Sequence, residues 1–241
     1  MTAPDLSVVF PVYNEEENLP ILLREISDAL TADGLTFEIV AVDDGSTDQS
    51  LEVLKSSRKT YPMLRILSLN QNSGQTAALD AAWRAARGRI LVSLDADLQN
   101  DPADIPRMLR VLRDQGADMV IGVRVNRMDS AWKRLQSRIG NGVRDWITGD
   151  HITDTGCSLK LVKAECTANV KLFNGMHRFL PTLIRLEGFT VVETGVNHRA
   201  RRFGQSKYSA WNRAFRGLAD CFAVRWMSRR RLHYSVREEL P

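Results

Sequence analysis

The chain has 241 residues, of which 44% are hydrophobic and 26% charged, and it carries a formal charge of +4. This composition is typical of a soluble globular protein with one large domain. No stretch of about 18 uncharged apolar residues is present, which excludes a membrane-spanning helix. The first residues lack the basic and apolar regions of a signal peptide, and the three cysteines form no C-x-x-C pair. We therefore expect a cytoplasmic protein with reduced thiols.

Charge is distributed unevenly along the chain. Residues 1–123 contain 11 Lys/Arg and 19 Asp/Glu, whereas residues 124–241 contain 22 and 10. Such asymmetry suggests that the second half meets something anionic, such as a phosphorylated substrate, nucleic acid or a membrane surface. A solvated basic face is the simpler alternative.

The first half alternates the patterns of strands and helices. Apolar runs predict strands, and helical spacing of leucines and alanines predicts the segments between them. This alternation favours an α/β fold with a largely parallel sheet and helices on both faces, so we expect ligands at the carboxyl ends of the strands. The expected strands are residues 7–12, 37–42, 64–69, 90–94 and 119–123, and the expected helices are 16–30, 49–57, 77–86 and one that opens at Asp101-Pro102.

The second half predicts two longer amphipathic helices, at residues 130–147 and 210–227, and short strands at 156–162 and 190–197. Each helix carries an apolar stripe, which could pack on the protein core or lie in a membrane interface. The stripes are Leu135, Ile139, Val143 and Trp146 in the first helix, and Trp211, Phe215, Leu218, Phe222 and Trp226 in the second.

Asp95-Ala96-Asp97 follows the apolar run 90–94. Residues i and i+2 of a strand point the same way, and two like charges at one place are unfavourable without a cation or a hydrogen-bonded ligand. Mg²⁺ and Mn²⁺ prefer oxygen ligands and often bridge to substrate phosphates. The pattern therefore predicts a metal-dependent site for a phosphorylated substrate, although an isolated Asp-x-Asp is also typical of a solvated acidic turn.

Two further strand ends carry polar groups. The first strand ends in Tyr13-Asn14-Glu15, and the second in the segment 43–48, Asp-Asp-Gly-Ser-Thr-Asp. A tyrosine ring can cover a nucleobase, and a carboxylate can accept from a base N–H or a ribose hydroxyl. The second segment alone could be an Asx turn that caps the next helix. No glycine-rich phosphate loop of either common type occurs, so a diphosphate would need a metal and cationic side chains.

These motifs together resemble family 2 glycosyltransferases, and more narrowly the polyprenyl-phosphate glycosyltransferases, the group that contains dolichyl-phosphate mannose synthases and bacterial undecaprenyl-phosphate sugar transferases. The resemblance extends over residues 5–228 and implies a single domain of the GT-A type, 1–228, with a nucleotide-sugar half, an acceptor half from residue 124 and a basic tail at 229–241. The motifs that carry it are 11–15, 42–48, Asn72-x-Gly74, 95–99, 122–124 and 201–208.

The resemblance also implies roles for single residues. The base and ribose would be held by Pro11, Tyr13, Glu15, Val42 and Asp44. Asp95 and Ala96 would line the donor, while Asp97 and Gln99 would bind the divalent metal, Mg²⁺ or Mn²⁺. Phosphates would be contacted by Arg124, Arg201 and Lys207, and the lipid phosphate by Lys133 and Ser137, positions for which Arg134 and Arg138 compete.

The implied activity is transfer of a sugar from a GDP- or UDP-linked donor to a polyprenyl phosphate at the inner face of the membrane, with inversion. Relatives that glycosylate hydroxyls usually show a further acidic base after the Asp-x-Asp. Here Asp150 and Asp154 are the nearest candidates, and a phosphate acceptor, with a second pKa near 6, needs no base. Since many relatives continue into transmembrane helices, a membrane-anchoring protein partner is a further expectation.

Two other functions fit the sequence less well. A cytosolic glycosyltransferase with a saccharide or other hydroxyl acceptor would need an acidic base. A nucleotide- or nucleic-acid-binding module would use the basic half, but few aromatic residues interleave the basic residues of 124–138, and such residues usually stack on bases. We therefore expect no nucleic-acid partner.

Overall fold

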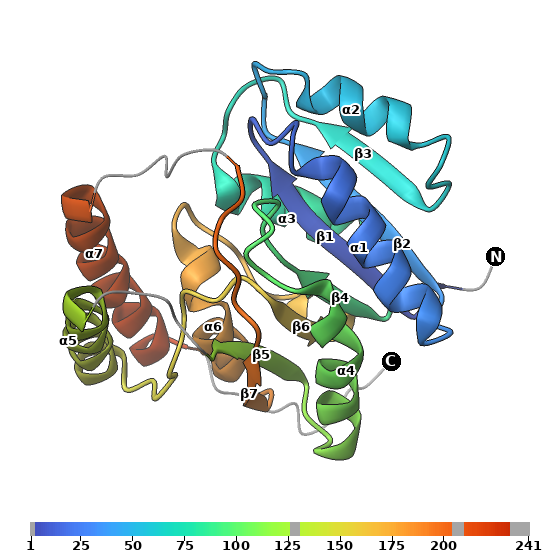
Figure 1. Cartoon of the computed structure of the whole chain (residues 1–241). Coiled ribbons are helices and arrows are strands. Elements are labelled where there is room, and N and C mark those ends of the chain that lie inside the picture. Colours follow the sequence, from blue (N-terminus) through green and yellow to red (C-terminus); the bar gives the residue numbers. More distant parts are fainter. Residues whose placement is uncertain (1–2, 126–130, 204–209, 232–241) are drawn as a thin grey trace, which may run out of the picture.

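A computed structural model describes residues 3–125, 131–203 and 210–231, without the side chains of 131–139 and 210–216. Its centre is a seven-stranded sheet in the order β3-β2-β1-β4-β6-β5-β7 (Figure 1). Strands from both halves of the chain enter this one sheet. The strands are β1 (Leu6–Val12), β2 (Phe37–Asp43), β3 (Leu64–Ser68), β4 (Ile90–Ser93), β5 (Met119–Arg124), β6 (Lys160–Lys163) and β7 (Val191–Val196).

Helices cover both faces of the sheet, as the alternation predicts. One face carries α1 (Leu19–Ala32), α2 (Ser50–Ser57) and α4 (Ile105–Asp114), and the other carries α3 (Gln75–Ala85) and α6 (Leu180–Leu186). Two further helices, α5 (Ala131–Thr148) and α7 (Ala210–Arg229), lie beside each other at one end of the molecule. Three short 3₁₀ helices complete the described elements: η1 (Pro102–Asp104), η2 (Ala164–Thr167) and η3 (Met176–Phe179).

The central strands are apolar on both sides because both sides are covered. In β1, Val8 and Phe10 enter the core under α1 and α4, whereas Val9 enters the core under α3 and α6. This follows from the two-residue period of a strand, which sends neighbouring side chains to opposite faces. Each fully buried side chain of this size contributes about 1.5–3 kcal/mol, so the apolar runs fix both the register and the layers.

Strand β6 differs from the prediction. The sequence suggested a strand at residues 156–162, but the strand occupies Lys160–Lys163 and runs antiparallel to both β4 and β5. Residues 156–159 form the loop that leads into it. Because β6 is antiparallel, its first residue, Lys160, pairs with Ser93 at the carboxyl end of β4.

The C-terminal helices form where they were predicted, and the described part of their apolar stripes is exposed. Trp146 of α5 and Phe222 and Trp226 of α7 are 80%, 56% and 64% exposed. Ile147 and Val224 face inward instead. Among the described residues, no helix is both long and apolar enough to cross a bilayer.

The edge of the sheet at the start of the strands holds a buried polar cluster around Glu38. Its carboxylate accepts hydrogen bonds from Ser7 Oγ (2.6 Å), Arg65 Nη1 (2.6 Å) and the Arg87 N–H (2.5 Å). Burial acts to raise the pKa of Glu38, but these three donors outweigh burial and hold the pKa below its usual value. The ionised form therefore ties β1, β2, β3 and the turn before β4 together.

We expect Glu38→Gln to lower the free energy of unfolding at pH 7 by about 1–3 kcal/mol, the usual cost of weakening a buried charged network. Because the pKa of Glu38 is lowered on folding, its stabilisation is complete above the unfolded value of 4.5 and disappears as pH falls through the folded value. Urea unfolding of both proteins from pH 7 to pH 3 tests this. The difference should shrink toward acid, and the exposed Glu52→Gln should show no such trend.

Candidate active site

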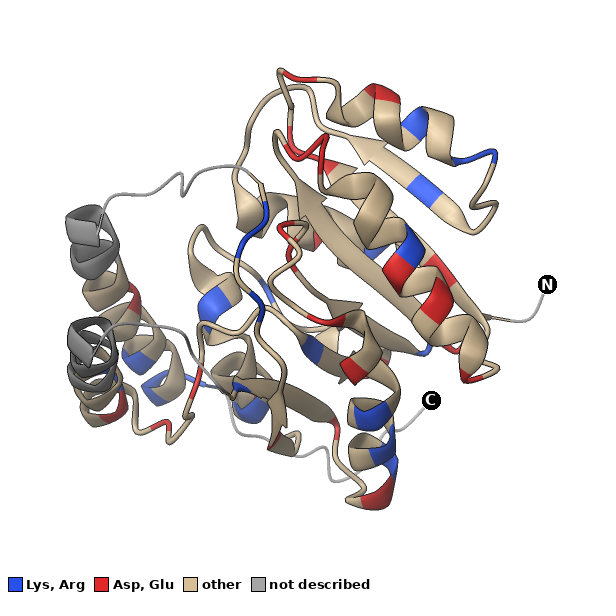
Figure 2. Ribbon diagram, in the orientation of Figure 1, with Lys and Arg blue, Asp and Glu red and all other residues tan. Residues whose placement is uncertain are grey.

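Three loops rich in carboxylates leave the same edge of the sheet. Strands β1, β2 and β4 are parallel neighbours, so Val12, Asp43 and Ser93 end close together. Figure 2 shows acidic segments in these loops, facing a basic segment that follows β7. This is the edge at which open α/β sheets bind their ligands, and the acidic motifs predicted from the sequence all lie there.

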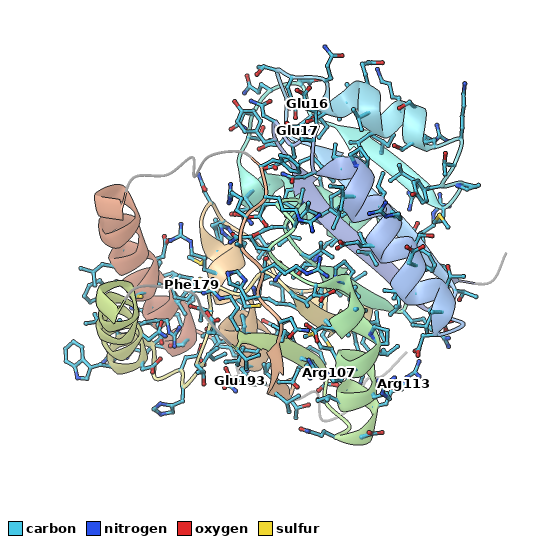
Figure 3. The ribbon with its side chains drawn as sticks, viewed as in Figure 1. Glu16, Glu17, Arg107, Arg113, Phe179 and Glu193 are labelled. Atoms are coloured by element: carbon cyan, nitrogen blue, oxygen red, sulfur yellow. The ribbon has the colours of Figure 1, made fainter. Side chains whose placement is uncertain are left out.

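The loops after β1 and β2 are bound to one another. Asn14 accepts from the Thr47 N–H (2.8 Å), and the Glu15 N–H donates to Ser50 Oγ (2.8 Å). Tyr13 and Glu15 are half-buried at this rim, next to the loop that carries Glu16 and Glu17 (Figure 3). Asn14 has a positive φ of 54°, a conformation that asparagine tolerates better than most residues. The structure thus places Tyr13 and Glu15, two of the five residues predicted to bind the nucleotide, at the edge of the sheet, and their binding role stays a prediction.

Asp44 organises a third loop. This residue is only 3% exposed, and its carboxylate accepts from the Ser73 N–H (2.7 Å), the Gly74 N–H (2.9 Å) and Asn72 Nδ2 (3.2 Å). Gly45 follows with φ at +69°, and a Cβ there would lie 2.6 Å from the Asn72 nitrogen. The segment Asn72-x-Gly74 therefore has a structural role, since its three residues each donate a hydrogen bond to the Asp44 carboxylate.

The other residues predicted to line the donor differ in accessibility. Pro11 lines the main cavity of the site, whereas the side chain of Val42 is fully buried in the core under α3. Ala96 is also buried. A contact of Val42 or Ala96 with a nucleotide-sugar would therefore use main-chain atoms, and these two roles stay predictions.

Asp97 is held by a cation from the far end of the sheet. Its carboxylate accepts from Arg201 Nη2 (2.7 Å) and from the Gln99 N–H (3.2 Å). Leu98 between them has a positive φ of 61°, an unfavourable conformation for a branched side chain that is often found at functional sites. The turn brings Gln99 back beside Asp97, and Arg201 compensates the charge of the Asp97 carboxylate. The predicted contact of Arg201 with phosphates stays a prediction.

Asp95 lies half-buried in the wall of the cavity, where Gln75 Nε2 donates to it at 2.8 Å. Burial raises the pKa of Asp95 to about 6, and the nearby charge of Asp97 adds to this effect. Ser158, Lys160 and Arg201 act in the opposite direction. A carboxyl group with such a pKa still carries its charge for most of the time at neutral pH, so the site keeps two anionic oxygen donors for a cation.

Arg124 pairs with Asp154. The guanidinium donates through Nε (2.7 Å) and Nη2 (2.8 Å) to the two carboxylate oxygens, a bidentate geometry that fixes both groups. Asp150 is likewise bound, by Arg185 Nη1 at 2.9 Å and by Thr182 Oγ1. Both aspartates that were the nearest candidates for a catalytic base are buried and ion-paired. The predicted contact of Arg124 with phosphates stays a prediction.

A cavity of about 750 Å³ lies between the strand ends and the second half of the chain. Its wall includes four polar residues to which the sequence analysis gave no role: Ser158, Lys160, His177 and Arg178. The sequence contained one signal for Lys160, since a lysine within an apolar run must find a polar partner when it is buried.

Five residues predicted to contact phosphates or the acceptor have side chains outside the described part of the structure: Lys133, Arg134, Ser137, Arg138 and Lys207.

The described residues contain no group of three or more His, Cys, Asp or Glu side chains that could hold a metal ion. A site with fewer protein ligands fits the residues at Asp97, because Mg²⁺ and Mn²⁺ commonly take one or two carboxylates and complete their shell with substrate phosphates and water. Asp97 and the neighbouring Gln99 offer oxygen donors of this kind.

Residues 7–166 match the family model described as Glycosyl transferase family 2. The chain belongs to this family. A dodecaprenyl-phosphate galacturonate synthase of Rhizobium johnstonii is 38% identical over 229 residues, which cover 93% of this chain and 68% of that protein. An undecaprenyl-phosphate 4-deoxy-4-formamido-L-arabinose transferase of Pseudomonas savastanoi is 40% identical over 206 residues, 85% of this chain. The match spans only 60% of that second relative.

Solved structures confirm the α/β fold of the GT-A type. A mannosyltransferase from Pyrobaculum calidifontis, in complex with GDP-mannose and Mn²⁺, superposes with a TM-score of 0.67 at 22% identity, over 92% of this chain and 64% of that one. Glucosyl-3-phosphoglycerate synthase from Mycobacterium tuberculosis gives 0.68 at 19% identity, over 92% and 80%. At these identities the likeness establishes the arrangement of the sheet and its helices.

We expect Asp44→Ala to loosen the loop 72–74, because three N–H donors lose their acceptor. The free energy of unfolding should fall by about 1–3 kcal/mol, and the amides of Ser73 and Gly74 should exchange faster in hydrogen-exchange experiments. The partly exposed Asp80→Ala, which loses only an ion pair on the surface of α3, is the matched control. Unchanged exchange at residues 72–74 would contradict the assigned role.

Proposed function

We propose that this chain transfers a sugar from a GDP- or UDP-linked donor to a polyprenyl phosphate, with inversion at the anomeric carbon. Membership of family 2 and two relatives named for polyprenyl-phosphate substrates support the proposal. The single observation that carries it is the cavity itself: Asp95 lies in its wall together with the cations Lys160 and Arg178. The two candidates for a base, Asp150 and Asp154, are instead buried in ion pairs.

The absence of a base at Asp150 and Asp154 suits a phosphate acceptor. A hydroxyl must lose a proton as it attacks, whereas a phosphate monoester is mostly dianionic at pH 7. Its difficulty is electrostatic, since each pair of unit charges at 4 Å repels by about 4 kcal/mol at an effective dielectric constant of 20. The basic second half of the chain reduces this repulsion. The protein therefore acts by positioning the two substrates and compensating their charges.

The donor would lie across the ends of β1, β2 and β4. In this proposal the base and ribose contact Pro11, Tyr13 and Glu15 with the main chain near Val42 and Asp44, and the sugar lies against Asp95 and Ala96. Tyr13 and Glu15 stand half-buried at the rim, where a planar base can stack. Arg124, Arg201 and Lys207 are assigned to the phosphates, and Lys133 and Ser137 to the acceptor.

A divalent cation, Mg²⁺ or Mn²⁺, would be held by Asp97 and Gln99. When bound, it supplies a Lewis acid that neutralises the leaving nucleoside diphosphate. Arg201 already pairs with Asp97, so the same guanidinium lies where the diphosphate would be and can turn toward it. Asp95, two residues before Asp97, is held in place by a hydrogen bond from Gln75 and would orient the sugar of the donor.

The acceptor is a membrane lipid, so the chain would work as a peripheral protein at the cytoplasmic face of the membrane. The exposed apolar side chains of α5 and α7 support this, together with cations at the end of α7. Aromatic residues next to arginines favour the interface of an anionic bilayer. The relatives extend beyond the region matched here, and a separate anchoring protein is a further proposed partner.

The test of the activity is a screen of UDP- and GDP-sugars with undecaprenyl phosphate in detergent and Mn²⁺, scored by release of nucleoside diphosphate. Release should require the phosphate, so undecaprenol should give none.

Asp97→Asn should lower the rate by about two orders of magnitude or more, as loss of transition-state charge stabilisation does elsewhere, with an unchanged circular dichroism spectrum. Asp114→Asn, on the far end of α4, should behave like wild type. Wild-type turnover in Asp97→Asn would remove the metal role.

Membrane contact can be measured separately by co-sedimentation with phosphatidylglycerol vesicles. We expect Phe222→Glu and Trp146→Glu each to weaken binding by about tenfold, since each removes an exposed aromatic side chain from the interface and adds a charge. Gln115→Glu adds the same charge at the exposed end of α4 and should bind like wild type. Equal binding of all four proteins would contradict this surface.

A further inference from the structure

The cavity is lined by residues from both halves of the chain. At one side it is lined by Pro11, Gln75 and Asp95, which belong to the donor half. At the other side it is lined by Ala219 and Asp220 of α7. On the same helix, Leu218 and Phe222, which flank these two residues in sequence, are 40% and 56% exposed. An elongated lipid with an anionic head could therefore place its head in the cavity and leave along α7.

Arg178 lies in the wall between these regions. It belongs to η3 and lines the cavity, and its Nη1 lies 3.9 Å from the position that a Cβ on Gly217 of α7 would take. Its guanidinium thus reaches α7 next to the exposed apolar residues. In the part of the chain that the structure describes, no carboxylate forms an ion pair with Arg178. Three other described guanidinium groups near the site are paired: Arg124 with Asp154, Arg201 with Asp97, and Arg185 with Asp150.

The turn that carries Arg178 is fixed. Gly175 adopts φ of +90°, and a Cβ there would lie 2.7 Å from Asp220 Oδ2. Its N–H donates to Thr76 Oγ1 (3.0 Å), which also shares a hydrogen bond with His177 Nδ1 (2.7 Å). Phe179, labelled in Figure 3, is buried in the core. These contacts tie η3 to the start of α3, so Arg178 has a defined position relative to the donor half.

The remaining cation of the wall is already compensated. Lys160 is buried, its Nζ donates to the Cys157 carbonyl, and Asp95 and Asp154 lie near enough to favour its charged form. Burial nevertheless lowers its pKa. Lys160 therefore balances Asp95 on the sugar side, and among the described residues that line the cavity Arg178 is the cation next to α7.

We propose that Arg178 binds the phosphate group of the polyprenyl phosphate and holds it in line with the donor sugar. The inference rests on the proposed function and adds a residue to the acceptor site. In the transfer step an acceptor phosphate oxygen forms a bond to the anomeric carbon, and the bond from that carbon to the nucleoside diphosphate breaks with its electron pair. No proton moves. A guanidinium suits this task because it offers paired N–H donors to two phosphate oxygens.

The test is a titration of the whole chain with geranyl phosphate, a prenyl monophosphate that dissolves in water, by calorimetry. Arg178→Gln should weaken binding at least tenfold, and Arg178→Lys should recover part of the loss. Arg113→Gln, an exposed arginine on α4 (Figure 3), is the matched control and should bind like wild type. Binding of UDP and GDP with Mn²⁺ should be equal in all four proteins. Titrations with geraniol and with inorganic phosphate show separately how far the lipid chain and the phosphate group contribute to binding.

A second variant leaves Arg178 in place. Gly217→Leu puts a side chain beside the guanidinium and should also weaken geranyl phosphate binding, with thermal unfolding measured alongside. In turnover, Arg178→Gln should raise KM for the lipid phosphate and leave KM for the donor unchanged.

Equal affinity of wild type and Arg178→Gln for geranyl phosphate would overturn the inference, as would a wild type that does not bind it. A rise in the KM of Arg178→Gln for UDP-galacturonate, with no rise for UDP-galactose, would also overturn it, because Arg178 would then bind the carboxylate of the donor sugar. Absence of transfer by wild type would count against the proposed function alone, while the titrations still decide the role of Arg178.

Discussion

The site depends on holding the carboxylates of three aspartates together at one edge of a parallel sheet. Asp44 follows β2, and Asp95 and Asp97 follow β4, with β1 between these two strands. The mutual repulsion of the three carboxylates would destabilise the fold without compensation. The structure compensates each locally. Asp44 receives main-chain N–H groups, Asp97 receives Arg201, and Asp95 receives Gln75 and the nearby charge of Lys160. Since Arg201 and Lys160 come from the second half of the sequence, that half is needed to stabilise the first.

Much of the fold could be predicted because it follows from local pattern. The apolar runs that became β1, β2, β3, β4 and β5 were found within a residue or two, since strands covered on both faces must be continuously apolar. The direction of β6 could not be predicted, because Lys160–Lys163 reads the same in either direction and only its neighbours decide its orientation. The helix expected to open at Asp101-Pro102 does so, first as the 3₁₀ turn η1 and then as α4. The short α6 was not predicted, although Pro181 lies in its first turn, where proline is tolerated.

The site was predictable to the extent that its residues follow strands. Asp95, Asp97, Tyr13 and Glu15 lie where the motifs indicated. Pairings across the chain were not predictable: Arg124 with Asp154, separated by 30 residues, and Asp97 with Arg201, separated by 104. No periodicity links such positions. For the same reason Arg178 had no assigned role, since only the tertiary structure places it in the wall of the cavity that Asp95 also lines.

The reversed direction of β6 has a consequence for how this fold can change over evolution. A strand that starts at the ligand-binding edge brings the loop before it, residues 149–159, to that edge as well. Substitutions in this loop can reshape the acceptor side of the cavity, while the parallel strands that carry the donor residues keep their register. The architecture thus allows recognition of the acceptor to diversify independently of recognition of the donor.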